Sequence, residues 1–147
     1  MRSPKKQYNT SVTFDRSMIA PCGMNCGSCI GYMRPLNTCP GCRQVDTGKA
    51  RVNCVIRTCD LLPKTGSGFC FDCIKYPCKR LRQLDNRYRT RYSTSFLENL
   101  TMIKEKGIDS FLAFETERRK CRHCGATLSV HRDSCLECQS KVDALSC

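Results

Sequence analysis

Cysteines are the residues of this 147-residue chain with the clearest capacity for chemistry, and there are 15 of them. Ten of them lie in a first stretch, from residue 22 to residue 78. A stretch this short cannot bury enough apolar surface to offset its chain entropy, so it needs another source of stability. Thiolate-bound metal ions would supply it, and we therefore predict that all ten cysteines of the first stretch are metal ligands. They are Cys22, Cys26, Cys29, Cys39, Cys42, Cys54, Cys59, Cys70, Cys73 and Cys78.

The alternative of a disulfide scaffold fits the sequence less well. Residues 1–20 carry early basic residues but no apolar run, so they do not resemble a signal peptide, and no later stretch is apolar enough to span a membrane. We therefore expect a cytoplasmic protein, and in a reducing cytosol clustered cysteines are more often ligands than disulfides. The odd number of cysteines also fits a full disulfide pairing poorly.

The spacing within the first stretch leaves the grouping of these ligands open. Two C-x2-C pairs, Cys39 with Cys42 and Cys70 with Cys73, have the spacing at which two sulfurs reach one ion. A sequential grouping would join Cys26 and Cys29 to the first pair, and Cys54 and Cys59 to the second. It would leave out Cys22 and Cys78, whereas an interleaved arrangement or a dinuclear cluster would use all ten.

A second set of cysteines lies near the end of the chain. Two C-x2-C pairs are separated by ten residues, and the four ligands are Cys121, Cys124, Cys135 and Cys138. With a strand expected over residues 127–130, this spacing predicts a zinc ribbon. Four thiolates leave no coordination position for water, so the site should be structural. We expect His123 and His131 to lie near the metal or at the surface, and Cys147 to be a free thiol.

The expected cofactor is Zn²⁺, with about three ions per chain. A zinc ion with four thiolates carries a charge of −2, so three of them would reduce the formal charge from +12 to +6. An iron–sulfur cluster is the minority alternative, because Cys22, Cys26 and Cys29 have the C-x3-C-x2-C spacing of radical S-adenosylmethionine enzymes. Too few residues follow, without βα repeats, to build the large barrel of those enzymes.

A helical segment is predicted between the two cysteine-rich parts. After Pro77, apolar residues recur every three or four positions at Leu81, Leu84 and Tyr88, which predicts an amphipathic helix. A capping box at Ser95 predicts a second helix that ends at Gly107, with a short third helix after it. The overall expectation is a small α+β metal-stabilised fold. It is divided into a flexible basic tail (1–17), a multi-metal region (18–78), a helical segment (79–119), a zinc ribbon (120–140) and a tail (141–147).

The first predicted helix is strongly basic, with Asp85 as its single acid. Arginine forks fit phosphate oxygens, and Tyr88 and Tyr92 could stack on unpaired bases. We therefore predict a nucleic-acid surface, with an acidic protein partner as the alternative. A third interpretation is a solvated helix face with its tyrosines packed inward. The predicted contact residues are Lys79, Arg80, Arg82, Arg87, Arg89 and Arg91.

The succession of cysteine motifs resembles a cysteine-rich domain family of bacteria and archaea of unknown function. The resemblance rests on the motifs at 22–29, 39–42, 54–59 and 70–78, and continues to about residue 138. It implies zinc binding in a soluble microbial protein and supplies neither reaction nor substrate.

An enzymatic role has little support in the sequence. A thiol-based redox enzyme would need a reactive cysteine beside a cation, and Cys78 is followed by Lys79 and Arg80, but ligation of Cys78 explains it equally. There is no glycine-rich phosphate loop, nucleophile elbow or His-Glu pair at ligand spacing. The sequence therefore favours a zinc-binding module over an enzyme and leaves the substrate and partner unidentified.

Overall fold

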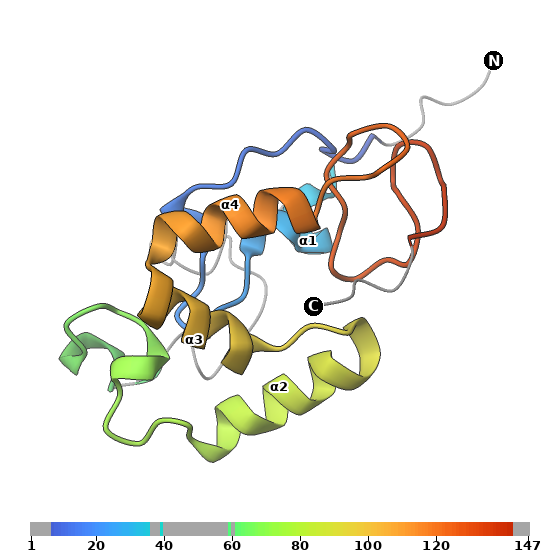
Figure 1. Ribbon diagram of the computed structural model, residues 1–147. Helices are drawn as coiled ribbons and strands as arrows, with labels where there is room; N and C mark the ends of the chain where they lie inside the picture. The colour runs from blue at the N-terminus through green and yellow to red at the C-terminus, as the bar shows by residue number, and fades with distance from the viewer. Residues whose placement is uncertain (1–6, 36–38, 40–58, 60, 143–147) are drawn as a thin grey trace.

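The computed structural model describes residues 7–35, 39, 59 and 61–142 of the chain. This part contains four α-helices: α1 (Ile30–Met33), α2 (Lys79–Tyr92), α3 (Phe96–Lys106) and α4 (Ile108–Arg118). In Figure 1, α2, α3 and α4 follow one another in a zigzag, and the C-terminal segment loops beyond the end of α4. Short 3₁₀ turns lie at Arg16–Met18, Cys26–Ser28, Leu62–Lys64 and Cys70–Asp72.

The expected α+β fold with a terminal zinc ribbon is wrong. The described residues form a mostly helical domain, and their only β pairings are isolated bridges. Residues 127–130 are all buried, and the amides of three of them bond to three separate segments. Thr127 donates to Thr10, Leu128 to Arg119 and Val130 to Ser28. A strand needs one neighbour that accepts successive bonds, and no single segment does so here.

The helix boundaries follow from local signals in the sequence. The hydroxyl of Ser95 accepts a hydrogen bond from the Glu98 amide at 3.2 Å, as the capping box predicts. Gly107, with φ of 88°, ends α3 and immediately precedes α4. Helix α4 runs for 11 residues and is therefore longer than the short helix expected.

Helix α2 is attached to α3 through its only acid. The buried Asp85 carboxylate accepts hydrogen bonds from the Ser95 hydroxyl at 2.8 Å and the Leu97 amide at 3.0 Å, and Arg89 donates to it at 2.7 Å. A carboxylate at the N-terminus of α3 also interacts favourably with the helix dipole. The interaction fixes α2 against α3 and turns the negative charge of α2 away from solvent.

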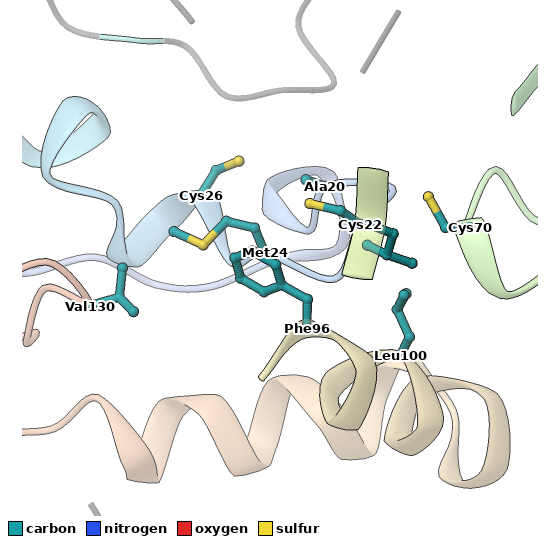
Figure 2. Close-up of a cluster of buried hydrophobic side chains, with 9 residues drawn as sticks. Ala20, Cys22, Met24, Cys26, Cys70, Phe96, Leu100 and Val130 are labelled. Carbon is teal, nitrogen blue, oxygen red and sulfur yellow. The ribbon is translucent and has the colours of Figure 1, made fainter. Parts of the chain in front are cut away.

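The main core lies between α3 and the first cysteine-rich segment. In Figure 2, Phe96 and Leu100 rise from α3, and the sulfurs of Cys22, Cys26 and Cys70 lie on the side of the cluster away from that helix. Leu81 of α2 and Val130 of the C-terminal segment complete the contact. A smaller cluster, formed by Ile19, Ile103 and Phe111, fills the angle between α3 and α4.

Part of the segment that the sequence analysis assigned to a tail packs against the other end of the described chain. The Thr127 amide donates to the carbonyl of Thr10 at 2.7 Å, and the Val12 amide donates to the Thr127 hydroxyl at 3.0 Å. The Thr10 hydroxyl also bonds to the Glu137 carboxylate at 2.9 Å. The division of the whole chain into five segments stays a prediction.

No helix within the described residues is both long enough and apolar enough to cross a membrane.

Gly23 is a position where the core requires glycine. Its φ of 91° is unfavourable for other residues, and an added Cβ would lie 3.0 Å from the Phe96 carbonyl oxygen and 3.1 Å from Leu100 Cγ. We expect Gly23→Ala to lower the free energy of unfolding by at least about 2 kcal/mol. Gly66→Ala is the matched control, because an added Cβ there meets nothing within 4 Å. Urea unfolding measures both, and equal stability of the two variants would contradict the packing described.

Candidate metal centre

Four cysteine sulfurs converge near the C-terminus in the geometry of a single metal ion. The ligand atoms of Cys121, Cys124, Cys135 and Cys138 all lie within 4.8 Å of one another. The sulfurs of Cys121 and Cys138 are 3.7 Å apart, and those of Cys124 and Cys135 are 3.6 Å apart. A tetrahedral ion with metal–sulfur bonds of about 2.3 Å requires sulfur–sulfur edges of about 3.8 Å. Because the two pairs share no sulfur, they correspond to opposite edges of that tetrahedron.

Both C-x2-C pairs are carried by the same kind of turn. In the first, the His123 amide donates to the Cys121 sulfur at 3.4 Å, and the Gly125 amide donates to the Cys121 carbonyl at 2.9 Å. In the second, Glu137 and Gln139 make the equivalent bonds to Cys135, at 3.4 Å and 2.9 Å. Gly125 and Gln139 both have positive φ, of 77° and 63°. The site is therefore built from two equivalent turns that face each other.

Each turn is closed at its base by an isolated β-bridge. Lys120 pairs with Thr127 in the first turn, and Ser134 pairs with Lys141 in the second. Amide hydrogen bonds to sulfur stabilise the thiolate over the thiol. In the first turn, the amides of Cys124 and His123 lower the pKa of Cys121, so the backbone favours the metal-binding form of that sulfur.

The electrostatics of the four thiols favour a bound cation. The Ser140 hydroxyl and amide lower the pKa of Cys138 to about 6. For Cys124, the Ala126 amide lowers the pKa, but desolvation and the neighbouring sulfurs outweigh it and raise the pKa to about 12. Four thiolates at this separation repel one another strongly, and a divalent ion between them removes the repulsion.

The two histidines of the chain lie in different surroundings. His123 is exposed on the first turn, outside the group of four ligands. His131 is partly buried and accepts a hydrogen bond from the Ile30 amide at Nδ1, at 3.3 Å. Its Nε2 lies 2.8 Å from the Tyr88 hydroxyl. Because Nδ1 accepts, the neutral ring carries its proton on Nε2, from which it donates to Tyr88. His131 thus connects the C-terminal segment to α1 and α2.

The cysteines of the first stretch are not brought together as closely. Among the described residues, the terminal four are the only group of three or more potential ligands within 4.8 Å. Near α1, Cys29 and Cys39 both approach the position that a Cβ would occupy on Gly31, at 3.6 and 3.7 Å. Cys42, Cys54 and Cys147 lie outside the described residues. The assignment of all ten cysteines as ligands stays a prediction.

The six predicted phosphate contacts of α2 are all exposed. Arg89 differs from the others because its guanidinium is paired with Asp85. The two tyrosines pack inward: Tyr88 contacts Phe96, and both Tyr88 and Tyr92 contact the His131 ring. The stacking of bases on Tyr88 is therefore not supported by its position, and the inward packing considered from the sequence is observed.

A groove that was not predicted from the sequence lies at the C-terminal end of α2. It has a volume of about 440 Å³, and its charged lining residues are Arg91, Arg119, Arg132 and one acid, Asp133. These arginines come from α2, from the end of α4 and from the C-terminal segment, so no local pattern in the sequence could have identified them as neighbours.

Arg119 brings an unbalanced positive charge to this groove. Its side chain is 4% exposed, and the buried Glu115 carboxylate is shared with Arg118, at 2.7 Å from Arg118 and 3.8 Å from Arg119. Within the described part of the chain, the Nε atom of Arg119 has no hydrogen-bond partner. Burial lowers the pKa of Arg119 to about 10, although Glu115 opposes this shift. One carboxylate between two guanidiniums leaves a net positive charge.

Comparison with known proteins gives one partial match. Residues 18–83 match the model of a family described as "Protein of unknown function (DUF3795)". The matched residues include the whole first cysteine-rich stretch and the start of α2, and they end before the terminal cysteines. The resemblance inferred from the cysteine motifs is thus supported over this part of the chain. No curated protein and no solved structure matches the chain.

His131 should make stability sensitive to mild acid. Burial, with Arg132 and Arg119 nearby, lowers its pKa from 6.5 to about 4. Between these values the unfolded chain binds a proton that the folded chain does not, so stability falls as the pH falls through this window. After allowance for partial exposure, we expect a loss of about 1 kcal/mol between pH 7 and pH 5.

Urea unfolding at the two pH values measures this effect. His131→Asn should remove the extra loss, whereas His123→Asn should retain it. Acid protonation of the cysteine ligands affects the unsubstituted protein and both variants equally, so it cancels in the comparison. An identical pH dependence in all three would show that His131 is not the sensitive group.

Proposed function

We propose that the terminal cysteines hold one Zn²⁺ as a structural site, and that the protein is a binding module for nucleic acid through the basic face of α2. The observation that carries the proposal is the orientation of charge on α2. Its only acid, Asp85, is buried against α3, and its six cations are exposed.

Zinc suits the donor set of the terminal site better than other common ions. Four sulfurs in tetrahedral arrangement favour zinc or iron, and a mononuclear site with four cysteines is the usual structural zinc site. Cys121 and Cys135 are buried, while Cys124 and Cys138 are exposed. With four thiolates bound, no position remains for a catalytic water. The remaining cysteines would supply further sites, for a total of about three zinc ions per chain.

The cations of α2 are arranged along the helix in a way that suits a polyanion. Arg80, Arg87 and Arg91 follow the seven- and four-residue spacing that places them along one side of a helix. Arg91 also lines the groove, which extends the positive surface towards Arg119 and Arg132. A row of guanidiniums that ends in a positively charged groove matches successive phosphates of a strand.

An acidic protein is the second candidate partner, since it would meet the same charges. The planar fork of arginine binds phosphate in a bidentate manner, and five of the six exposed cations of α2 are arginine rather than lysine. This composition favours phosphate as the ligand. Binding of an acidic peptide in preference to an oligonucleotide would support the second candidate.

Loss of one terminal ligand should release one metal ion. Cys138 is exposed, so Cys138→Ser removes a thiolate without leaving a buried hole. We expect one zinc ion fewer per chain by elemental analysis, and faster amide exchange over residues 120–142 with α3 still protected. His123→Ala is the control and should keep the full zinc content. A Cys138→Ser protein with unchanged zinc would contradict the site.

Charge reversal on α2 should weaken binding to a labelled single-stranded RNA. We expect Arg87→Glu with Arg91→Glu to reduce affinity at least tenfold, and to lower the slope of log K against log salt by about 1.4. Lys104→Glu with Lys106→Glu makes the same change in net charge on α3, where both lysines are exposed. This control should bind almost normally. An equal loss of RNA affinity in both double variants would mean that net charge alone drives binding.

A further inference from the structure

We propose that Cys59, Cys70, Cys73 and Cys78 form a second mononuclear zinc site. All four cysteines line one small cavity between the 3₁₀ turn Cys70–Asp72 and the start of α2. They come from three separate places in the chain, and no spacing rule alone groups them this way. The inference is independent of the terminal centre and of nucleic-acid binding.

The size of the cavity fits one ion. Its volume is about 30 Å³, while a single water molecule needs roughly 10 to 15 Å³ on the same kind of measure. The cavity therefore has room for a single ion.

The lining chemistry selects a soft metal. Besides the four cysteines, the cavity is lined by Leu62, Tyr76, Arg80 and Leu81, without a carboxylate or an imidazole. Hard cations such as Mg²⁺ and Ca²⁺ require oxygen ligands, whereas four sulfurs in apolar surroundings suit zinc. A zinc ion with four thiolates carries a charge of −2, and Arg80 is the only cationic residue among those that line the cavity.

The backbone around these cysteines repeats features of the terminal site. The Lys75 amide donates to the Cys73 sulfur at 3.4 Å, the same two-residue offset and distance as the bonds to Cys121 and Cys135. Cys78 immediately precedes α2 as its N-cap residue. The backbone thus offers Cys73 the same kind of amide contact that the terminal turns offer to Cys121 and Cys135.

The sulfurs stand further apart here than in the terminal site. Within the described residues, no three of these four cysteines offer ligand atoms within 4.8 Å of one another. They surround the cavity, so an ion inside it has to draw them inward through rotation of their side chains. The site would then join residue 59 and the 70–78 segment to the beginning of α2.

This grouping answers a question that the sequence left open. Cys59 would share its ion with Cys70, Cys73 and Cys78, so Cys78 would no longer be left over as it is in the sequential grouping. Among the described residues, Cys22, Cys26, Cys29 and Cys39 would remain outside this site.

Zinc stoichiometry of serine variants tests the grouping. In the 147-residue chain purified without oxygen, Cys59→Ser and Cys73→Ser should each lose one ion per chain, and the double variant should lose the same single ion. Cys73→Ser combined with Cys138→Ser should lose two, and Cys29→Ser should keep the ion held by Cys73. Loss of two ions from the Cys59 and Cys73 double variant, or of none, would overturn the proposal.

A second variant keeps the test decisive if serine prevents folding. Cys73→His retains a ligand, and in protein loaded with Co²⁺ it should shift part of the absorption from a four-sulfur towards a three-sulfur, one-nitrogen spectrum. The equivalent substitution of an exposed residue, Lys75→His, should leave the spectrum unchanged. A Cys73→His spectrum identical to that of the unsubstituted protein would exclude Cys73 as a ligand.

Discussion

Repulsion between neighbouring thiolates is the constraint on which the C-terminal part of this structure depends. Four sulfurs approach within 4.8 Å of one another. Ser140 lowers the pKa of Cys138 to about 6, while desolvation and the neighbouring sulfurs raise the pKa of Cys124 to about 12. A fold that holds such a group together needs a cation in its centre, or it must keep some of the thiols protonated. The buried segment at 127–130 begins immediately after the first of the two turns. Its packing against α2 and its hydrogen bonds to residues 10 and 12 therefore depend on how those turns are held.

Around α2, the structural acids and the cations differ in burial. Acidic groups with structural roles, Asp85 and Glu115, are buried and bind several partners, whereas the cations of α2 remain at the surface. Removal of carboxylates from the surface makes that surface more positive than composition alone indicates. The groove beside α2 results from the same arrangement, because Glu115 is shared between two arginines and cannot neutralise both.

Local signals in the sequence were sufficient to predict some features of the structure. The capping box at Ser95 and the glycine at 107 mark the limits of α3, and the paired C-x2-C spacing identifies the four terminal cysteines that converge. The prediction of a strand at 127–130 was wrong. The alternation of polar and apolar residues there does not specify which segments accept the backbone hydrogen bonds. Arg119 could not be recognised as a groove residue, since its burial depends on contacts with Glu115 and Thr94.

The contacts between residues 9–12 and the C-terminal segment have a consequence for the lifetime of the protein. Thr10 bonds to Thr127 and to Glu137, and Glu137 lies inside the second metal-binding turn. Opening of that turn would therefore loosen both extremities of the described chain together. Proteases engage exposed, unstructured segments first. An ion held by that turn, as proposed, would therefore protect both of these segments at once.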